Sequence, residues 1–256
     1  MLDGRDVSVP DDGGSLLGAL RDHLGVRTAK DGCSPQGQCG CCTVLVDDAP
    51  RVACVTPVRR VRGREVTTAA GLTTEEQHRW STAFVAAGAS QCGFCTPGIV
   101  CRLVGHERRG GDVADDLVLD KALAAHLCRC TGWQTIREAA AVAAGETVVE
   151  IRDLAGAEER ARLETGGPQR VDPSVVLGHS GFSDDTAPGE ALVAVRSAEG
   201  WTVGESVHAA RQAAGKIQGR RTTLDPAPPL ELPAGEFALT LRTSWVAEGF
   251  AFTPPN

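Results

Sequence analysis

The first 70 residues combine short strand-like runs with one helical pattern. Four leucines recur at helical spacing ahead of Gly25, where a helix would end: Leu16, Leu17, Leu20 and Leu24. Strands are expected near Val7 and Val9 and in the runs 43–46, 52–55 and 58–67. The sequence Asp47-Asp48-Ala49-Pro50 between two of these runs predicts a hairpin. Residues 1–70 are therefore expected to form a small α+β domain.

After Gly71 the hydrophobic pattern becomes helical. Four helices are expected to start near Thr73, Thr96, Asp115 and Thr135 and to end near Gly88, Gly110, Leu127 and Gly145. Capping boxes are expected at the first and last of them, formed by Thr73 with Glu76 and by Thr135 with Glu138. Thr96 is the expected N-cap of the helix that opens with Pro97. The pattern predicts a four-helix bundle over residues 71–150.

The remaining residues, 151–256, are expected to be a linker followed by a smaller α+β segment. The stretch 151–170 is charged and contains glycine, as is typical of a linker on a surface. A hairpin is predicted from 191–195 and 201–203, and a helix over 205–215. Alternating apolar positions predict a last strand over 237–246.

Composition excludes some classes of partner. The chain of 256 residues has a formal net charge of -7, so it has no electrostatic reason to bind nucleic acid or an anionic membrane. No segment has the length and apolarity of a membrane span. Ten cysteines without a secretory signal indicate a reducing compartment, where thiols persist as metal ligands, and the cytoplasm is the expected location.

All ten cysteines lie between Cys33 and Cys130, and their spacing indicates two metal sites. The first set lies in the glycine-rich sequence GCSPQGQCGCC and is completed by Cys54 after eleven residues. This spacing, C-x5-C-x2-C and a fourth thiol, is close to the plant-type 2Fe-2S pattern with one extra residue in the first gap. Glycine lets the backbone N-H groups of such a loop turn toward the sulfur atoms.

The second set consists of QCGFCTPG, ahead of a predicted helix, and LCRCTGW, after another. C-x2-C and C-x-C would thus place four sulfur atoms at one junction of helices. The positive end of a helix favours thiolates there. Tetrahedral zinc is the alternative for these four cysteines, but zinc sites rarely use a glycine-rich loop like that of the first set.

The other cysteines and the histidines are not expected to bind metal or to act in catalysis. Cys41 and Cys101 have no place in either pattern, and Cys101 is expected to be a small core residue. The histidines form no metal-binding motif and are expected to be surface or core residues: His23, His78, His106, His126, His179 and His208. No G-x-G-x-x-G follows a strand, so a nicotinamide or flavin site on this chain is not supported.

Over residues 3–145, the three motifs GCSPQGQCGCC, QCGFCTPG and LCRCTGW resemble the small subunit of the xanthine oxidase family of molybdenum hydroxylases. The resemblance implies a plant-ferredoxin-like β-grasp domain followed by a four-helix domain. It implies one 2Fe-2S cluster on Cys33, Cys39, Cys42 and Cys54. It implies a second 2Fe-2S cluster on Cys92, Cys95, Cys128 and Cys130.

The same resemblance implies a role and partners. Single electrons would pass from molybdenum on a large subunit through the helical-domain cluster, then the ferredoxin-type cluster, to FAD on a medium subunit. Gln91 and Cys130 match positions that contact the molybdopterin, which is expected in its cytosine dinucleotide form. A hetero-oligomer is therefore expected. Trp133 stands where the family usually has tyrosine.

The segments VLGHSGFSDDTAPGEALVAV and LTLRTSWVAEGF resemble the beginning of the molybdenum-binding subunit of the same family. They suggest that the chain fuses the small subunit to the first part of the large one; the alternative is an extension that serves docking alone. The alternatives for the chain as a whole are a free-standing ferredoxin-like carrier or iron-sulfur redox sensor, and a zinc-binding interaction module.

Overall fold

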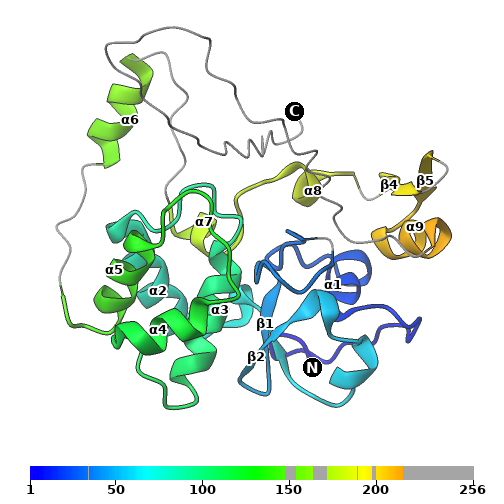
Figure 1. Cartoon of the computed structure of the whole chain (residues 1–256), viewed down its shortest axis with the longest axis horizontal. Helices are drawn as coiled ribbons and strands as arrows, with labels where there is room; N and C mark the ends of the chain where they lie inside the picture. Colours follow the sequence, from blue (N-terminus) through cyan, green and yellow to red (C-terminus); the bar gives the residue numbers. More distant parts are fainter. Residues whose placement is uncertain (34, 148–153, 164–171, 189, 198–199, 216–256) are drawn as a thin grey trace, which may run out of the picture.

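The computed structural model describes residues 1–33, 35–147, 154–163, 172–188, 190–197 and 200–215. In this part of the chain helices are mixed with two small sheets, which confirms the expected α+β content. Figure 1 shows the N-terminal strands and α1 on one side of the molecule and helices α2 to α5 on the other. No helix among the described residues has the length and apolarity needed to cross a membrane.

The N-terminal part contains one short helix and a three-stranded sheet. Its elements are α1 (Leu16–Gly18), which continues as the π-helical turn η1 (Ala19–His23), β1 (Thr43–Val46), β2 (Ala49–Val52), β3 (Val66–Thr67), and the 3₁₀ turns η2 (Ala53–Val55), η3 (Val58–Val61) and η4 (Ala69–Gly71). The strand order is β2-β1-β3, with both pairs antiparallel. The predicted leucine helix and its end at Gly25, where φ is +66°, are confirmed.

The hairpin is present, but its second strand lies three residues earlier than predicted. Asp47 and Asp48 both have positive φ, 47° and 61°, which makes a two-residue turn that matches the twist of the strands. Pro50 therefore lies inside β2, opposite Leu45. It is tolerated there because β2 is an edge strand.

Of two other strand predictions in this part, the one near Val7 and Val9 was wrong and the one over 58–67 holds only for Val66–Thr67. No strand forms at Val7 or Val9. The N-terminal residue that pairs with β3 is Leu2, through an isolated bridge to Val66. Within 58–67 only β3 is extended.

The four predicted helices are confirmed. They are α2 (Thr74–Ala87), α3 (Thr96–Glu107), α4 (Asp116–Leu123) and α5 (Gln134–Ala143). The capping box of Thr73 and Glu76 is complete in both directions. The capping box predicted at Thr135 was wrong, because Trp133, with φ at +74°, is the N-cap and Thr135 already lies inside α5. Cys95, not Thr96, is the N-cap of α3.

Helix α3 joins the two halves of the molecule. It packs against β1 and β2, and it can approach closely because two of its residues are glycines. A Cβ on Gly105 would lie 2.6 Å from Pro50 Cγ. Strand β1 is buried on both faces: Leu45 belongs to the core of the helices, whereas Val44 and Val46 belong to a second core with α1.

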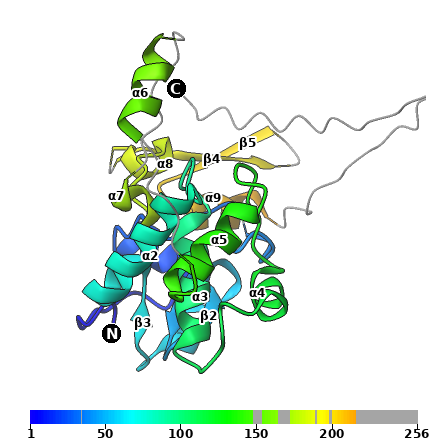
Figure 2. The ribbon, with the colours of Figure 1, turned by 90° about the vertical axis from the view of Figure 1, so that its left-hand side faces the viewer.

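The C-terminal part adds α6 (Leu154–Leu163), α7 (Pro173–Val176), α8 (Ser183–Thr186), β4 (Val193–Ser197), β5 (Gly200–Gly204) and α9 (Val207–Ala214). Helix α6 lies within the stretch expected to be a linker. Strands β4 and β5 form the predicted antiparallel hairpin, and α9 packs against both (Figure 2). The predicted strand over 237–246 lies outside the described residues.

Candidate metal centres

The first set of cysteines comes together between α1 and the β1–β2 hairpin. Cys33, Cys39 and Cys42 lie on the loop before β1, and Cys54 lies in η2 directly after β2. The backbone N-H of Cys54 donates to the Cys42 sulfur over 3.4 Å, and the N-H of Gln36 donates to the Cys33 sulfur over 3.3 Å. Cys33 is half-buried, and the other three are buried.

The pKa values of these thiols are shifted because their sulfur atoms lie close together. A hydrogen bond from the Cys42 side chain lowers the pKa of Cys54 to about 7, and Cys33 contributes to the same shift. The pKa of Cys42 is raised, first by Cys54 and then by burial. Cys41 is the main cause that lowers the pKa of Cys39 to about 6, with a smaller contribution from Cys33. The four predicted residues are therefore neighbours in space.

The second set of cysteines lies where α3 begins and where the chain passes from α4 to α5. The sulfur atoms of Cys92 and Cys130 are 3.5 Å apart. A hydrogen bond from Cys95 is the main cause that lowers the pKa of Cys128 to about 5, and Thr131 Oγ1, 3.0 Å from the Cys128 sulfur, contributes. Burial raises the pKa of Cys92 to about 11.

In the second set the sulfur atoms are arranged in two pairs, Cys92 with Cys130 and Cys95 with Cys128. In the first set Cys42 lies with Cys54, and Cys33 lies near both Cys54 and Cys39. No group of three or more metal-ligating side chains in the described part of the chain fits one ion. Each set holds four thiols, the number of ligands that a 2Fe-2S cluster needs, with two thiolates on each iron.

Glycines leave the space that each site requires. A Cβ on Gly32 would lie 2.9 Å from the Cys39 sulfur. Gly93, between Cys92 and Cys95, has φ at +78°, a conformation that other residues adopt only with strain. Both loops therefore depend on glycine beside a candidate sulfur ligand, as the sequence suggested for the first of them.

The two loops touch each other. The backbone N-H of Leu127, next to Cys128, donates to the carbonyl of Cys39 over 2.9 Å. A Cβ on Gly98 of α3 would lie 2.9 Å from the backbone carbonyl atoms of Cys41. The structure thus places the two sets of thiols at one interface, a result that their spacing in the sequence did not reveal.

His126 fills this interface and was missed as a residue of the site. Its Nε2 lies 3.1 Å from Thr43 Oγ1, and only 4% of the residue is exposed. Burial, with a smaller contribution from Arg102, lowers its pKa to about 4, so the ring is neutral at pH 7. Its position beside LCRC was the available signal, although nothing in the sequence links it to the first loop.

Cys41 and Cys101 have different surroundings. Cys101 lies in the core of the helices, as expected. Cys41 is buried beside the first set, where its thiol donates to the Cys39 carbonyl over 3.7 Å. No pattern in the sequence indicated that Cys41 lies so close to the first candidate metal site.

The residues that the resemblance links to molybdopterin lie at the surface. Gln91, Cys92 and Cys130 are all exposed, so the second site borders solvent on one side. This surface lies on the helical part of the chain and is accessible to another chain.

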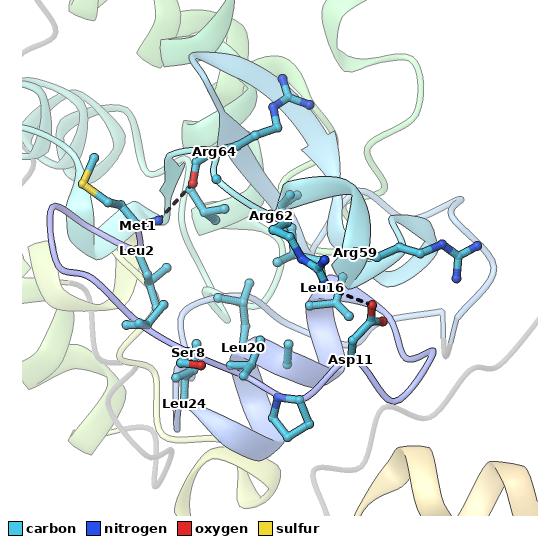
Figure 3. Close-up of a pocket in the computed structure, with 18 residues that line it drawn as sticks. Met1, Leu2, Ser8, Asp11, Leu16, Leu20, Leu24, Arg59, Arg62 and Arg64 are labelled. Atoms are coloured by element: carbon cyan, nitrogen blue, oxygen red, sulfur yellow. Dashed lines mark hydrogen bonds and ion pairs between the residues drawn. The ribbon is translucent and has the colours of Figure 1, made fainter.

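A separate cavity of about 230 Å³ lies in the N-terminal part (Figure 3). It is lined by apolar residues such as Leu16 and Leu20 and by Arg59 at its rim, and Arg62 forms an ion pair with Asp11 over 3.3 Å. None of the ten cysteines lines this cavity. It is therefore distinct from the candidate metal centres.

Comparison with known proteins identifies relatives that bind 2Fe-2S clusters or belong to molybdenum-containing oxidoreductases. Residues 68–141 match the family of [2Fe-2S] binding domains. The chain is 38% identical to a probable xanthine dehydrogenase component of Bacillus subtilis over 125 residues, which cover 49% of this chain and 71% of that protein. It is 33% identical to the isoquinoline 1-oxidoreductase subunit alpha of Brevundimonas diminuta over 149 residues, 57% of this chain and 96% of that protein.

Longer relatives are matched over a small part of their length. The chain is 35% identical to the xanthine dehydrogenase of Blastobotrys adeninivorans over 53% of its own length but only 10% of that enzyme. The aldehyde oxidoreductase of Desulfovibrio gigas superimposes with a TM-score of 0.58 at 28% identity, over 77% of this chain and 23% of that one. The chain therefore belongs to the 2Fe-2S iron-sulfur subunits and domains of the xanthine dehydrogenase and aldehyde oxidoreductase family of molybdenum-containing oxidoreductases.

Proposed function

We propose that this chain relays single electrons between a molybdenum centre on one partner chain and FAD on another through two 2Fe-2S clusters. When bound, each cluster accepts and releases one electron. The first cluster would be held by Cys33, Cys39, Cys42 and Cys54. The second cluster would be held by Cys92, Cys95, Cys128 and Cys130.

The observation that carries this proposal is the contact between the two cysteine loops. The hydrogen bond from Leu127 to Cys39 and the packing of Gly98 on Cys41 bring a ligand loop of each site within van der Waals distance of the other. Electron transfer between two centres falls steeply with distance, so this contact is what a relay needs. An isolated carrier with one cluster would have no use for it.

The surfaces of the two sites support an order of transfer. Cys130 and Gln91 are exposed on the helical part, and we propose that this surface faces the molybdopterin. The first loop also reaches the surface, at Pro35 and Gln36, on the N-terminal part. We propose that this second surface faces the flavin chain, so that the two clusters lie in series.

The C-terminal part supports the fusion with the start of a molybdenum-binding subunit. The D. gigas superposition covers 77% of the chain, whereas residues 1–150 make up less than three fifths of it. The β4–β5 hairpin leaves Leu192 66% and Trp201 71% exposed. Large apolar side chains in such a position are typical of a surface that a partner covers. We propose that this partner is the chain that carries the rest of the molybdenum-binding subunit.

Purification of the full chain, alone and with a candidate molybdenum-binding chain, tests the proposal. About four iron and four acid-labile sulfide atoms per chain are expected, because each 2Fe-2S cluster holds two of each. Dithionite should produce two EPR signals with different temperature dependence. A colourless zinc protein, or a chain with one cluster, would contradict the relay. If the full chain copurifies with the partner chain and Trp201→Ser weakens this association, the result would support the fusion.

A further inference from the structure

Residues 172–186, which contain α7 and α8, run from the helical part toward the N-terminal part (Figure 1). They contact Gly93 and Phe94 of the second cysteine loop, and Thr28 and Lys30 just before the first. We propose that this segment is a clamp that fixes the two cluster-binding loops relative to each other, and that Asp185 is its positioning residue. The inference rests on the proposed two-cluster relay, and it assigns to the C-terminal part a role inside this chain in addition to partner binding.

The first half of the clamp is anchored in the helical part. Val176 is fully buried and belongs to the core of the helices, and α7 packs against α2 and α3. Val175, which is 3% exposed, covers Gly93 of the second cysteine loop. A Cβ on Gly93 would lie 3.1 Å from the Val175 carbonyl oxygen, so this contact requires glycine between Cys92 and Cys95.

An aromatic pair connects the clamp to both loops. The rings of Phe182 and Phe94 meet edge to face, with centroids 4.9 Å apart. Phe94 lies between Cys92 and Cys95, and its Cε1 is 3.1 Å from the position that a Cβ on Gly32 would occupy. Gly32 precedes Cys33, so this one contact reaches the first loop as well as the second.

Buried charges anchor the second half of the clamp in the N-terminal part. Asp185 accepts hydrogen bonds from Arg21, over 3.1 Å, and from Lys30. The Lys30 ammonium also donates to the carbonyl of Gly178 over 2.8 Å. The exposed fractions of these three side chains are 6% for Arg21, 1% for Lys30 and 8% for Asp185.

This charge cluster is tied directly to the first metal loop. The backbone N-H of Lys30 donates to the carbonyl of Cys41 over 3.2 Å. Asp185 is a carboxylate shared by both buried cations, so its removal takes a countercharge from Arg21 and Lys30 together. One segment is thus fixed to Gly93 at one end and to Lys30 at the other, and movement of either loop would disrupt it.

The magnetic interaction between the two reduced clusters tests the clamp in the full chain. Its EPR splitting depends on the distance and orientation of the clusters, not on turnover. Asp185→Asn should reduce or abolish the splitting while iron content is retained, and it should speed hydrogen exchange in residues 28–33 and 92–98. Asp11→Asn, which breaks an exposed pair with Arg62, is the matched control and should change neither measurement.

Phe182→Ala gives a second route in case Asp185→Asn does not fold, because it keeps the ion pairs of Asp185 and removes only the ring that packs on Phe94 and lies over the Lys30 ammonium. It too should reduce the splitting and speed exchange in both loops. Wild-type splitting and exchange in both variants would overturn the clamp. A wild-type chain that binds no clusters would contradict the relay instead, and hydrogen exchange at the two loops would then test the clamp by itself.

Discussion

The backbone N-H of Leu127 donates to the carbonyl of Cys39 over 2.9 Å, which joins a ligand loop of each candidate cluster by a direct hydrogen bond. The two residues are 88 positions apart in a chain whose helical and strand parts have separate cores. Gly40 and His126 flank this bond and pack on each other. The geometry of the proposed relay therefore depends on a few contacts at one interface.

Gly40→Ala should damage this interface. Its φ is +72°, and the added Cβ would lie 2.8 Å from the Ala125 carbonyl oxygen and would overlap the His126 ring. We expect a loss of more than about 2 kcal/mol in the free energy of unfolding, from backbone strain and the clash together. Urea denaturation measures this loss.

Gly63→Ala is the matched control for that change. Gly63 has φ at +70°, but a Cβ there would meet nothing within 4 Å. It should cost about 1 kcal/mol from backbone strain alone. Equal losses in the free energy of unfolding at both positions would show that the contact between residue 40 and His126 does not contribute to stability.

Single ligand substitutions should remove the clusters one at a time. Cys42→Ser should abolish the EPR signal of the first cluster, and Cys95→Ser that of the second, because the two sets of thiols share no residue. Each variant should keep about half of the iron. Loss of both signals from either substitution would contradict separate sites.

The two remaining cysteines should not be needed for iron binding. Cys41→Ala and Cys101→Ala should both keep the full iron and sulfide content. Cys41→Ala should shift the reduction potential of the first cluster, since its thiol lies beside Cys39 and contacts around a ligand tune the potential. Cys101→Ala, in the core of the helices, should leave both potentials unchanged. A loss of iron with Cys41→Ala would identify Cys41 as a ligand.

Stability should fall in acid partly because of His126. Its pKa is about 4 in the folded chain and near 6.5 in the unfolded chain. As the pH falls, the His126 ring is therefore protonated in the unfolded chain before it is protonated in the folded one, which favours unfolding. The contribution, about 3 kcal/mol, is complete above pH 6.5 and is lost as the pH falls toward 4. His126→Gln should therefore flatten the change in urea midpoint between pH 6.5 and 5.5.

His78, which is exposed, provides the control for that experiment. His78→Gln should follow the wild-type dependence on pH, because His78 is exposed and lies outside the interface that buries His126. A wild-type slope in His126→Gln would mean that the buried ring makes no difference to acid stability.

The sequence by itself determined the local features of this protein. The spacing of eight cysteines defined two sets of thiols, and hydrophobic periodicity with Thr73 and Glu76 located the four helices, because these signals act within a few turns of chain. Predictions of element bounds were wrong where two local conformational preferences competed at neighbouring residues. Pro50 suggested a turn, but left-handed Asp47 and Asp48 form it and leave Pro50 on the edge strand.

Only the tertiary structure decided how the two sets of thiols meet. Cys42 meets Cys54 through the β1–β2 hairpin, and Cys95 at the start of α3 meets Cys128 on the loop before α5. The bond from Leu127 to Cys39 forms where the helical part packs on the N-terminal part. The burial of Lys30 with Asp185, which are 155 positions apart, is of the same kind. No pattern along the chain encodes such contacts, because they depend on how the surfaces of the two parts fit together and not on local spacing.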